Sequence, residues 1–109
     1  MTQAIHATEI NEAYAELARA QKDAHAQMEQ AVEAKAELDR NLLSGLADGT
    51  IDGKNQAMRD ACAAQVLKQE FAALDIAEIN ARAAKLNLDL AHTEVHRIQA
   101  LLRLAELTS

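Results

Sequence analysis

Residues 46–55 read Leu-Ala-Asp-Gly-Thr-Ile-Asp-Gly-Lys-Asn, and this stretch decides the fold of the chain. All three glycines of the 109 residues lie within it or, like Gly45, directly beside it, and the chain has no proline. Glycine ends helices in the left-handed conformation, whereas Asp and Asn begin them as caps. On either side, nothing in the sequence interrupts a helix. The stretch therefore predicts one turn between two long helices.

We expect an all-α fold: a long antiparallel helical hairpin, coiled-coil-like, forming the single domain 1–109. Helix one should span about residues 3–46, the turn 47–54, and helix two about 55–107. Gly45 or Gly49 would supply the left-handed residue after helix one, and Asp52 or Asn55 would cap helix two. Half of the residues are hydrophobic but only 2% are aromatic. Because much of this content is alanine, the helices should pack closely.

One apolar series of helix two recurs every seven residues, and a second lies three residues after it, which predicts a coiled-coil-like seam against helix one. The first comprises Leu67, Leu74, Ala81, Leu88, Val95 and Leu102, and the second Ala77, Ala84, Ala91, Ile98 and Ala105. In helix one the matching series is Ile10, Leu17, Ala24, Ala31 and Leu38, widened by Tyr14, Met28, Val32 and Leu43.

Helix two carries a second apolar stripe on nearly the opposite side, at about 100° per residue. Helix one covers one face only, so we expect the second stripe to mediate self-association. A dimer that forms a four-helix bundle is the simplest closed solution. The alternative is that these side chains stay partly exposed, as single leucines often do. The expected interface comprises Ile76, Ile79, Leu86, Leu90, Leu104 and Leu107, with Ala83 and Ala100 between them.

The charge pattern bears on the class of partner. The net charge is −6, and residues 1–48 hold nine acidic side chains against four basic ones. Nucleic acid and anionic membranes both require a basic face, so neither is an expected partner.

No apolar run has the length of a membrane span. The lone Cys62 cannot form an internal disulfide and suits a reducing compartment. We therefore expect a cytoplasmic protein.

The turn offers a candidate anion site. Backbone N–H groups at the start of helix two point out of the helix end, and Lys54, Asn55 and Arg59 lie within reach of a phosphate there. Asp48, Asp52 and Asp60 crowd the same place and would repel an anion. The simpler interpretation, which we favour, is a capped turn with solvated charges.

The histidines offer a candidate metal site. His92 and His96 are four residues apart on one helical face, a spacing that can share a metal ion. If the chain folds back near residues 49–51, paired residue numbers sum to about 100–102, and His6 then lies opposite His96. Zinc would bind all three imidazoles, or two of them and a carboxylate. Solvated imidazoles explain the same spacing and are the interpretation we favour.

Catalysis is not expected, and the sequence indicates no cofactor. Cys62 lies near the turn, whereas His6, His92 and His96 lie near the other end of the hairpin, about 45 Å away at 1.5 Å per residue. We therefore predict that Cys62 is a small core residue. No serine triad, phosphate-binding glycine loop or pair of catalytic carboxylates is visible in the sequence.

The segment Asp48 to Arg59 resembles a pattern in small, mostly uncharacterised proteins of tailed bacteriophages and prophages. In those proteins an acidic, alanine-rich helix leads into Gly-x-Ile-x-Gly-Lys-Asn-x-x-x-Arg and a second helix. The match here covers about a dozen residues: Gly49, Ile51, Gly53, Lys54, Asn55 and Arg59. The resemblance implies a phage-encoded protein that works in the bacterial cytoplasm, and it brings no known active site.

Small oligomeric phage proteins without catalytic residues commonly act by binding. We therefore expect a non-enzymatic, oligomeric binding or sequestering protein that captures a host protein or an anionic nucleotide signal in antiphage defence. The alternative is a structural or scaffolding helical bundle without a small-molecule ligand. A metal-dependent activity at the three histidines ranks third.

Overall fold

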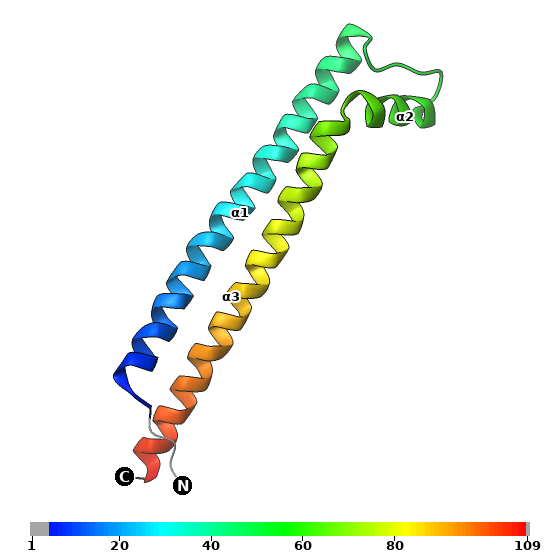
Figure 1. The fold of residues 1–109 in the computed structure, drawn as a ribbon. Coiled ribbons are helices and arrows are strands. Elements are labelled where there is room, and N and C mark those ends of the chain that lie inside the picture. The colour runs from blue at the N-terminus through cyan, green and yellow to red at the C-terminus, as the bar shows by residue number, and fades with distance from the viewer. Residues whose placement is uncertain (1–4, 109) are drawn as a thin grey trace. The chain divides into compact units, whose positions relative to one another are not determined.

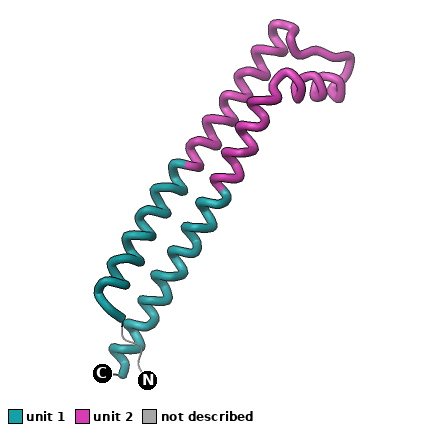
Figure 2. The backbone as a smooth tube through the Cα atoms, viewed as in Figure 1, with its two compact units in different colours: residues 1–26, 82–109 teal, residues 27–81 magenta. Residues whose placement is uncertain are grey.

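The computed structural model describes residues 5–108, which divide between two compact units (Figures 1 and 2). Unit 1 comprises residues 1–26 and 82–109, and unit 2 comprises residues 27–81. The described residues form helices α1 (Ala7–Asp48), α2 (Gln56–Val66) and α3 (Lys68–Thr108), with no strand among them. The predicted all-α class is confirmed. The predicted start of helix one, at about residue 3, lies outside the described residues.

Unit 1 pairs the first part of α1 with the last part of α3 in antiparallel orientation (Figure 2). Its core is formed by Ala13, Val95 and Ile98, of which Ile98 is only 1% exposed. A small residue opposite two branched ones allows the backbones to approach closely, as the alanine content predicts. Ile5, Ile10 and Leu17 pack around this core, and Ala20, Ala24, Ala84 and Ala91 are also buried.

Unit 2 contains the end of α1, the turn, α2 and the start of α3. A buried cluster of Leu38, Ile51, Ala63 and Leu67 joins the end of α1, the turn, α2 and the residue between α2 and α3. Ile51 is 2% exposed although it lies in the turn itself. Burial of such a side chain contributes about 1.5–3 kcal/mol. The turn is therefore anchored by its own apolar residue as well as by its capping groups. Leu42, Cys62 and Leu74 are partly buried and pack against the cluster, so Cys62 lies at the edge of the core and not within it.

Gly49 and Gly45 have different roles in the turn. Gly49 follows the last residue of α1 and adopts a φ of 82°, so it is the predicted left-handed residue. Gly45 is buried within α1, and its carbonyl accepts a hydrogen bond from the Ile51 N–H at 2.9 Å. A Cβ atom on Gly45 would lie only 2.6 Å from Cδ1 of Ile51. The missing side chain at residue 45 is therefore what allows Ile51 to pack against α1.

The prediction that helix two runs unbroken from about 55 to 107 is wrong at Leu67, where the chain bends between α2 and α3 (Figure 1). Leu67 has φ −105° and ψ 29°, outside the helical region. Its N–H still donates to the Ala63 carbonyl at 2.8 Å, and its carbonyl accepts from the Phe71 N–H at 2.9 Å. Because Leu67 is buried against Leu38 and Ile51, tertiary packing accounts for the bend. Neither glycine nor proline marks it.

The bend also changes the pairing of α1 with α3. Gln99 donates to the Tyr14 hydroxyl at 3.0 Å in unit 1, and the Asn41 amide lies 3.5 Å from a Glu70 carboxylate oxygen in unit 2. These partners have residue numbers that sum to 113 and 111, not the predicted 100–102. The difference of about ten residues matches the length of α2, which takes no part in the pairing of α1 with α3.

The predicted seam is largely confirmed, except near its C-terminal end. From Leu67 to Ile98 every seam residue of α2 and α3 is buried or half-buried, whereas Leu102 and Ala105 are exposed. The matching series of α1 is buried or half-buried throughout. The four residues predicted to widen it are exposed: Tyr14, Met28, Val32 and Leu43.

Candidate functional site

Of the three predicted anion-binding residues, Asn55 and Arg59 form hydrogen bonds within the turn. Asn55 is the N-cap of α2, and its Oδ1 accepts a hydrogen bond from the Met58 N–H at 2.9 Å. This bond satisfies one of the N–H groups that a phosphate would otherwise contact. Of the two predicted caps, Asn55 therefore fills the role and Asp52 does not.

Arg59 is likewise engaged within the turn. Its guanidinium donates to the Gly53 carbonyl at 3.3 Å and to Oε1 of Gln56 at 3.4 Å. Lys54 is exposed. In the same segment Asp60 accepts a hydrogen bond from the Gln56 amide at 2.7 Å. The geometry of this corner matches the capped turn that we favoured from the sequence.

Asp48 adds a negative charge to the turn. Its carboxylate accepts a hydrogen bond from the Thr50 N–H at 2.9 Å. Hydrogen bonds from the Thr50 side chain, and then from its backbone, lower the pKa of Asp48 below its ordinary value. Asp48 is therefore ionised at neutral pH and opposes an anion at the turn.

The predicted metal site is not assembled. His92 and His96 lie on one face of α3 with ring centroids 6.2 Å apart. Within residues 5–108, no three His, Cys, Asp or Glu side chains come close enough together to hold a metal ion. The prediction that His6 completes the site is wrong because it assumed the pairing that α2 displaces.

The predicted interface residues of α3 are all left uncovered by the chain. All six are between 56 and 78% exposed, although each is a leucine or isoleucine: Ile76, Ile79, Leu86, Leu90, Leu104 and Leu107. Ile76 and Ile79 belong to unit 2, and the four leucines belong to unit 1. Within unit 1 the four leucines lie outside the core formed with α1 by Val95 and Ile98, although Leu90 borders a shallow groove that Glu16 of α1 also lines. This apolar face of α3 is the strongest candidate for a functional surface.

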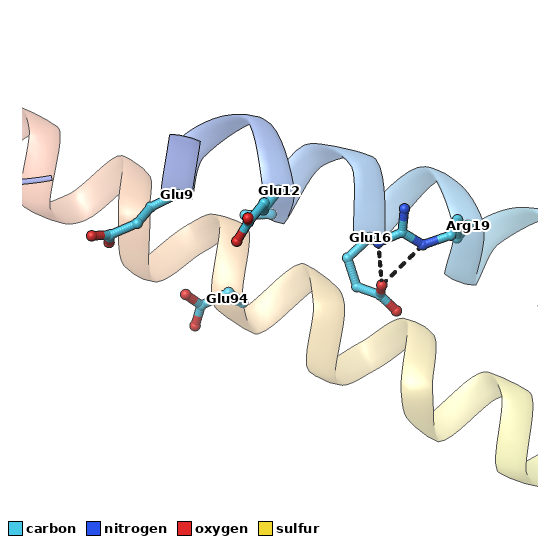
Figure 3. A pocket seen from close by; sticks show the side chains of 6 residues that line it. Glu9, Glu12, Glu16, Arg19 and Glu94 are labelled. Carbon is cyan, nitrogen blue, oxygen red and sulfur yellow. Dashed lines mark hydrogen bonds and ion pairs between the residues drawn. The ribbon is translucent and has the colours of Figure 1, made fainter. Parts of the chain in front are cut away.

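Sequence reasoning missed an open acidic groove in unit 1, where α1 lies beside α3 (Figure 3). Glu9, Glu12 and Glu16 of α1 line it together with Glu94 of α3. Arg19 bonds Glu16 at 2.7 Å and so offsets one of the four carboxylates. Assigning Glu94 to this groove requires the helix pairing, which is why the sequence alone did not reveal it.

Glu94 also bonds Arg97 on its own helix, at 2.6 Å. The hydrogen bond from Arg97, and to a smaller extent its charge, lowers the pKa of Glu94 even though partial desolvation opposes the shift. The same hydrogen bond raises the pKa of Arg97. The pair is therefore charged throughout the physiological range, at the border between the groove and the apolar face.

Two further findings concern the chain as a whole. Within residues 5–108, no helix has both the length and the apolar character that a membrane span requires. Comparison of the chain with protein-family models, curated proteins and solved structures gives no match.

Proposed function

We propose that this protein is a self-associating, non-enzymatic binding protein of phage type. It works in the host cytoplasm and sequesters a host protein that takes part in antiphage defence. The observation that carries the proposal is the exposed apolar face of α3, with four leucines more than half exposed in unit 1. Isolated exposed leucines are common, but an aligned set on one helix is typical of an interaction surface. The phage context rests on the resemblance of residues 48–59.

A protein surface is a better-supported partner than a nucleotide. Apolar side chains gain most by burial against other apolar side chains, and the face of α3 offers several. At the turn, Asn55 and Arg59 already form hydrogen bonds within the chain, which leaves Lys54 as the cation that a phosphate would meet. We therefore assign the main binding role to α3 and keep nucleotide capture as the weaker form of the proposal.

Light scattering over a wide range of protein concentration tests the self-association. The parent should have at least the mass of a dimer, and Leu86→Gln/Leu104→Gln should have the mass of one chain with an unchanged helical circular dichroism spectrum. Lys85→Gln is the matched control, because Lys85 is exposed on the same helix outside the apolar face. A parent that stays a single chain at every concentration would refute the proposal.

The nucleotide form is tested separately by thermal unfolding in the presence of mono-, di- and cyclic nucleotides. Lys54→Ala is the informative variant because Lys54 is exposed, whereas Arg59→Ala would also disturb the turn. A nucleotide that raises the unfolding temperature of the parent but not of Lys54→Ala supports capture of an anion. If no nucleotide stabilises the parent, nucleotide capture is excluded and only the proposal of a protein partner remains.

A scaffolding role is the second candidate, and a specific observation favours it. In unit 2, α1 exposes a set of apolar side chains of its own: Met28, Val32, Leu43 and Leu46. A chain with two separate interaction surfaces can form oligomers larger than a closed dimer. Masses that keep rising with concentration, and that fall back to a dimer in Val32→Gln/Leu43→Gln, would favour the scaffold. A constant dimer mass favours the sequestering protein.

A further inference from the structure

Leu67, the one residue between α2 and α3, keeps the backbone hydrogen bonds of a continuous helix. Its N–H donates to the Ala63 carbonyl at 2.8 Å, and its carbonyl accepts from the Phe71 N–H at 2.9 Å. Both bonds join residues four apart, as in an α-helix. Only the dihedral angles differ, with φ −105° and ψ 29° in place of about −63° and −42°. The bend is therefore a rotation at a single residue.

The sequence on both sides of Leu67 favours a straight helix. Residues 56–81 contain eight alanines and no glycine. Alanine has the highest helix propensity of all residues. A straight helix would also pair the last carbonyls of α2 with the first N–H groups of α3, which two separate helices leave without a partner inside the helix. Local chemistry therefore opposes the bend, and packing in unit 2 has to maintain it.

The packing that maintains the bend involves few residues of α2. Of its eleven residues Ala63 alone is buried, Arg59 and Cys62 are half-buried, and the other eight are exposed. Ala63 packs with Ile51 of the turn and with Leu67 at the bend. An alanine buries little apolar area, so Ile51 and Leu67 provide most of the apolar contact that holds α2 in place. Segments with few buried apolar contacts are those that open at low cost.

We propose that Leu67 is a hinge on which α2 detaches from the core of unit 2 and continues α3 as one straight helix. The detached state uncovers Ile51. It also frees the Cys62 thiol, which otherwise donates a weak hydrogen bond to the Thr50 carbonyl at 3.6 Å. α2 thereby acts as a movable cover over one end of the core. This hinge lies within unit 2 and does not depend on the self-association proposed for α3.

The turn is long enough for this movement. The paired residue numbers in unit 2 sum to 111, so Asp48 lies level with Ala63. In a straight helix Gln56 lies seven residues, about 10 Å, further along the axis. With packed helices about 9 Å apart, the two ends of the turn are then separated by about 14 Å. Residues 49–55 can span about 23 Å, so α1 and α3 keep their pairing while α2 moves.

Pulsed electron paramagnetic resonance on the full chain measures the position of α2. Spin labels at Ala57→Cys and Asn80→Cys, in a Cys62→Ser background, mark exposed residues of α2 and α3. In a straight helix the two labels are about 35 Å apart, and the bend brings them closer together. The parent should show the shorter distance and a minor population near the longer one. An excess of unlabelled protein removes distances between chains.

Ile51→Ser is the releasing variant, because it removes the apolar anchor without changing the sequence of either helix. The longer distance should become the major one. Val66→Ser is the matched control: it replaces an apolar residue beside the hinge that is already 46% exposed. It should leave the distances of the parent unchanged.

The Cys62 thiol gives an independent measurement in protein without labels. Its rate of alkylation by N-ethylmaleimide, followed by mass spectrometry, should rise about tenfold or more in Ile51→Ser, because the thiol reacts from the open state. In Val66→Ser the rate should stay close to that of the parent. The helical circular dichroism signal should be kept in both variants, because detachment extends α3 and unfolds no helix.

Three results would overturn the hinge. A parent that shows the shorter distance alone has a fixed bend, whatever the variants do. Faster alkylation of Ile51→Ser with a loss of helical signal and a broad range of distances means that α2 unfolds and does not join α3. A longer distance that increases equally in Val66→Ser and Ile51→Ser means that Ile51 is not the anchor.

Discussion

The turn at residues 49–55 and the exposed face of α3 in unit 1 use their side chains in opposite ways. At the turn, the residues that resemble a ligand site hold the chain together, since Asn55 caps α2 and Arg59 bonds the Gly53 carbonyl. On α3, Leu86 and Leu104 are of a type common in cores, yet each is more than half exposed. Chemical type alone therefore does not tell which side chains the fold uses: polar residues hold the turn together, while leucines of α3 stay exposed.

The largest effect is expected from truncating the apolar residue of the turn. Ile51→Ala should lower the free energy of unfolding by about 2–5 kcal/mol, because Ile51 is fully enclosed by the unit 2 core and would leave a cavity. Leu86→Ala is the matched change on α3. Measured by urea unfolding at a concentration where the protein is a single chain, it should change stability by less than about 0.5 kcal/mol.

These two variants test whether the apolar face of α3 is covered within the chain. A loss for Leu86→Ala as large as that for Ile51→Ala, at a dilution where light scattering shows a single chain, would mean that the face is covered within the chain. At higher concentration the loss for Leu86→Ala should grow, since association stabilises the folded state by mass action.

The next effect is expected from Gly45→Ala. In an exposed helix interior this change stabilises by about 1 kcal/mol. Here the added Cβ would meet the Ile51 side chain at 2.6–2.8 Å, so the change should destabilise by about 1–3 kcal/mol. Ile51→Val removes the nearest atom, Cδ1, and should restore part of the loss. Ser44→Ala, one residue earlier and exposed, is the control for helix propensity.

A gain in the unfolding temperature for Gly45→Ala would contradict this account of the turn. It would mean that Ile51 can move aside without leaving its cluster. In that case Gly45→Ala causes no loss of stability, and adding Ile51→Val to it would restore nothing.

A smaller effect is expected from the helix cap. Asn55→Ala removes the acceptor of the Met58 N–H and should cost about 1 kcal/mol in urea unfolding. Asn55→Asp keeps an acceptor and should cost less. Lys54→Ala, the neighbouring change at an exposed residue, should leave stability within about 0.5 kcal/mol of the parent. Equal losses at Lys54 and Asn55 would show that Lys54 also supports the turn.

The parts of the fold that depend on local chemistry were predictable from the sequence. Gly49 in the left-handed conformation and Asn55 as a cap follow from residue type and position alone. Helical periodicity separated the two faces of α3, because spacings of three and four determine which residues share a side. These features require no knowledge of what packs against what.

The remaining parts depend on contacts between distant residues. The bend at Leu67 arises from its packing against Leu38 and Ile51, and its sequence neighbours favour an unbroken helix. The bend removes α2 from the pairing, so the predicted pairing sum of 100–102 was wrong, and the candidate metal site inferred from it is not assembled among residues 5–108. The groove carboxylate Glu94 was missed for the same reason.

The smallest effect is expected from the ionisation of Asp48. Its pKa is lowered by hydrogen bonds from Thr50, so the folded state favours the carboxylate. Its contribution to stability is complete above the pKa of the unfolded carboxyl, about 3.9, and is lost as the pH falls through the lower pKa of the folded state.

Asp48→Asn keeps an oxygen acceptor but does not titrate. The unfolding temperature of the parent should therefore exceed that of Asp48→Asn at neutral pH, and the difference should disappear as the pH falls through the lowered pKa of the folded state. The self-association of α3 should show no such dependence on residue 48, because the face contains none of the turn. If the difference between the two proteins stays constant from neutral to acidic pH, the Thr50 hydrogen bonds contribute through geometry and not through the charge of Asp48.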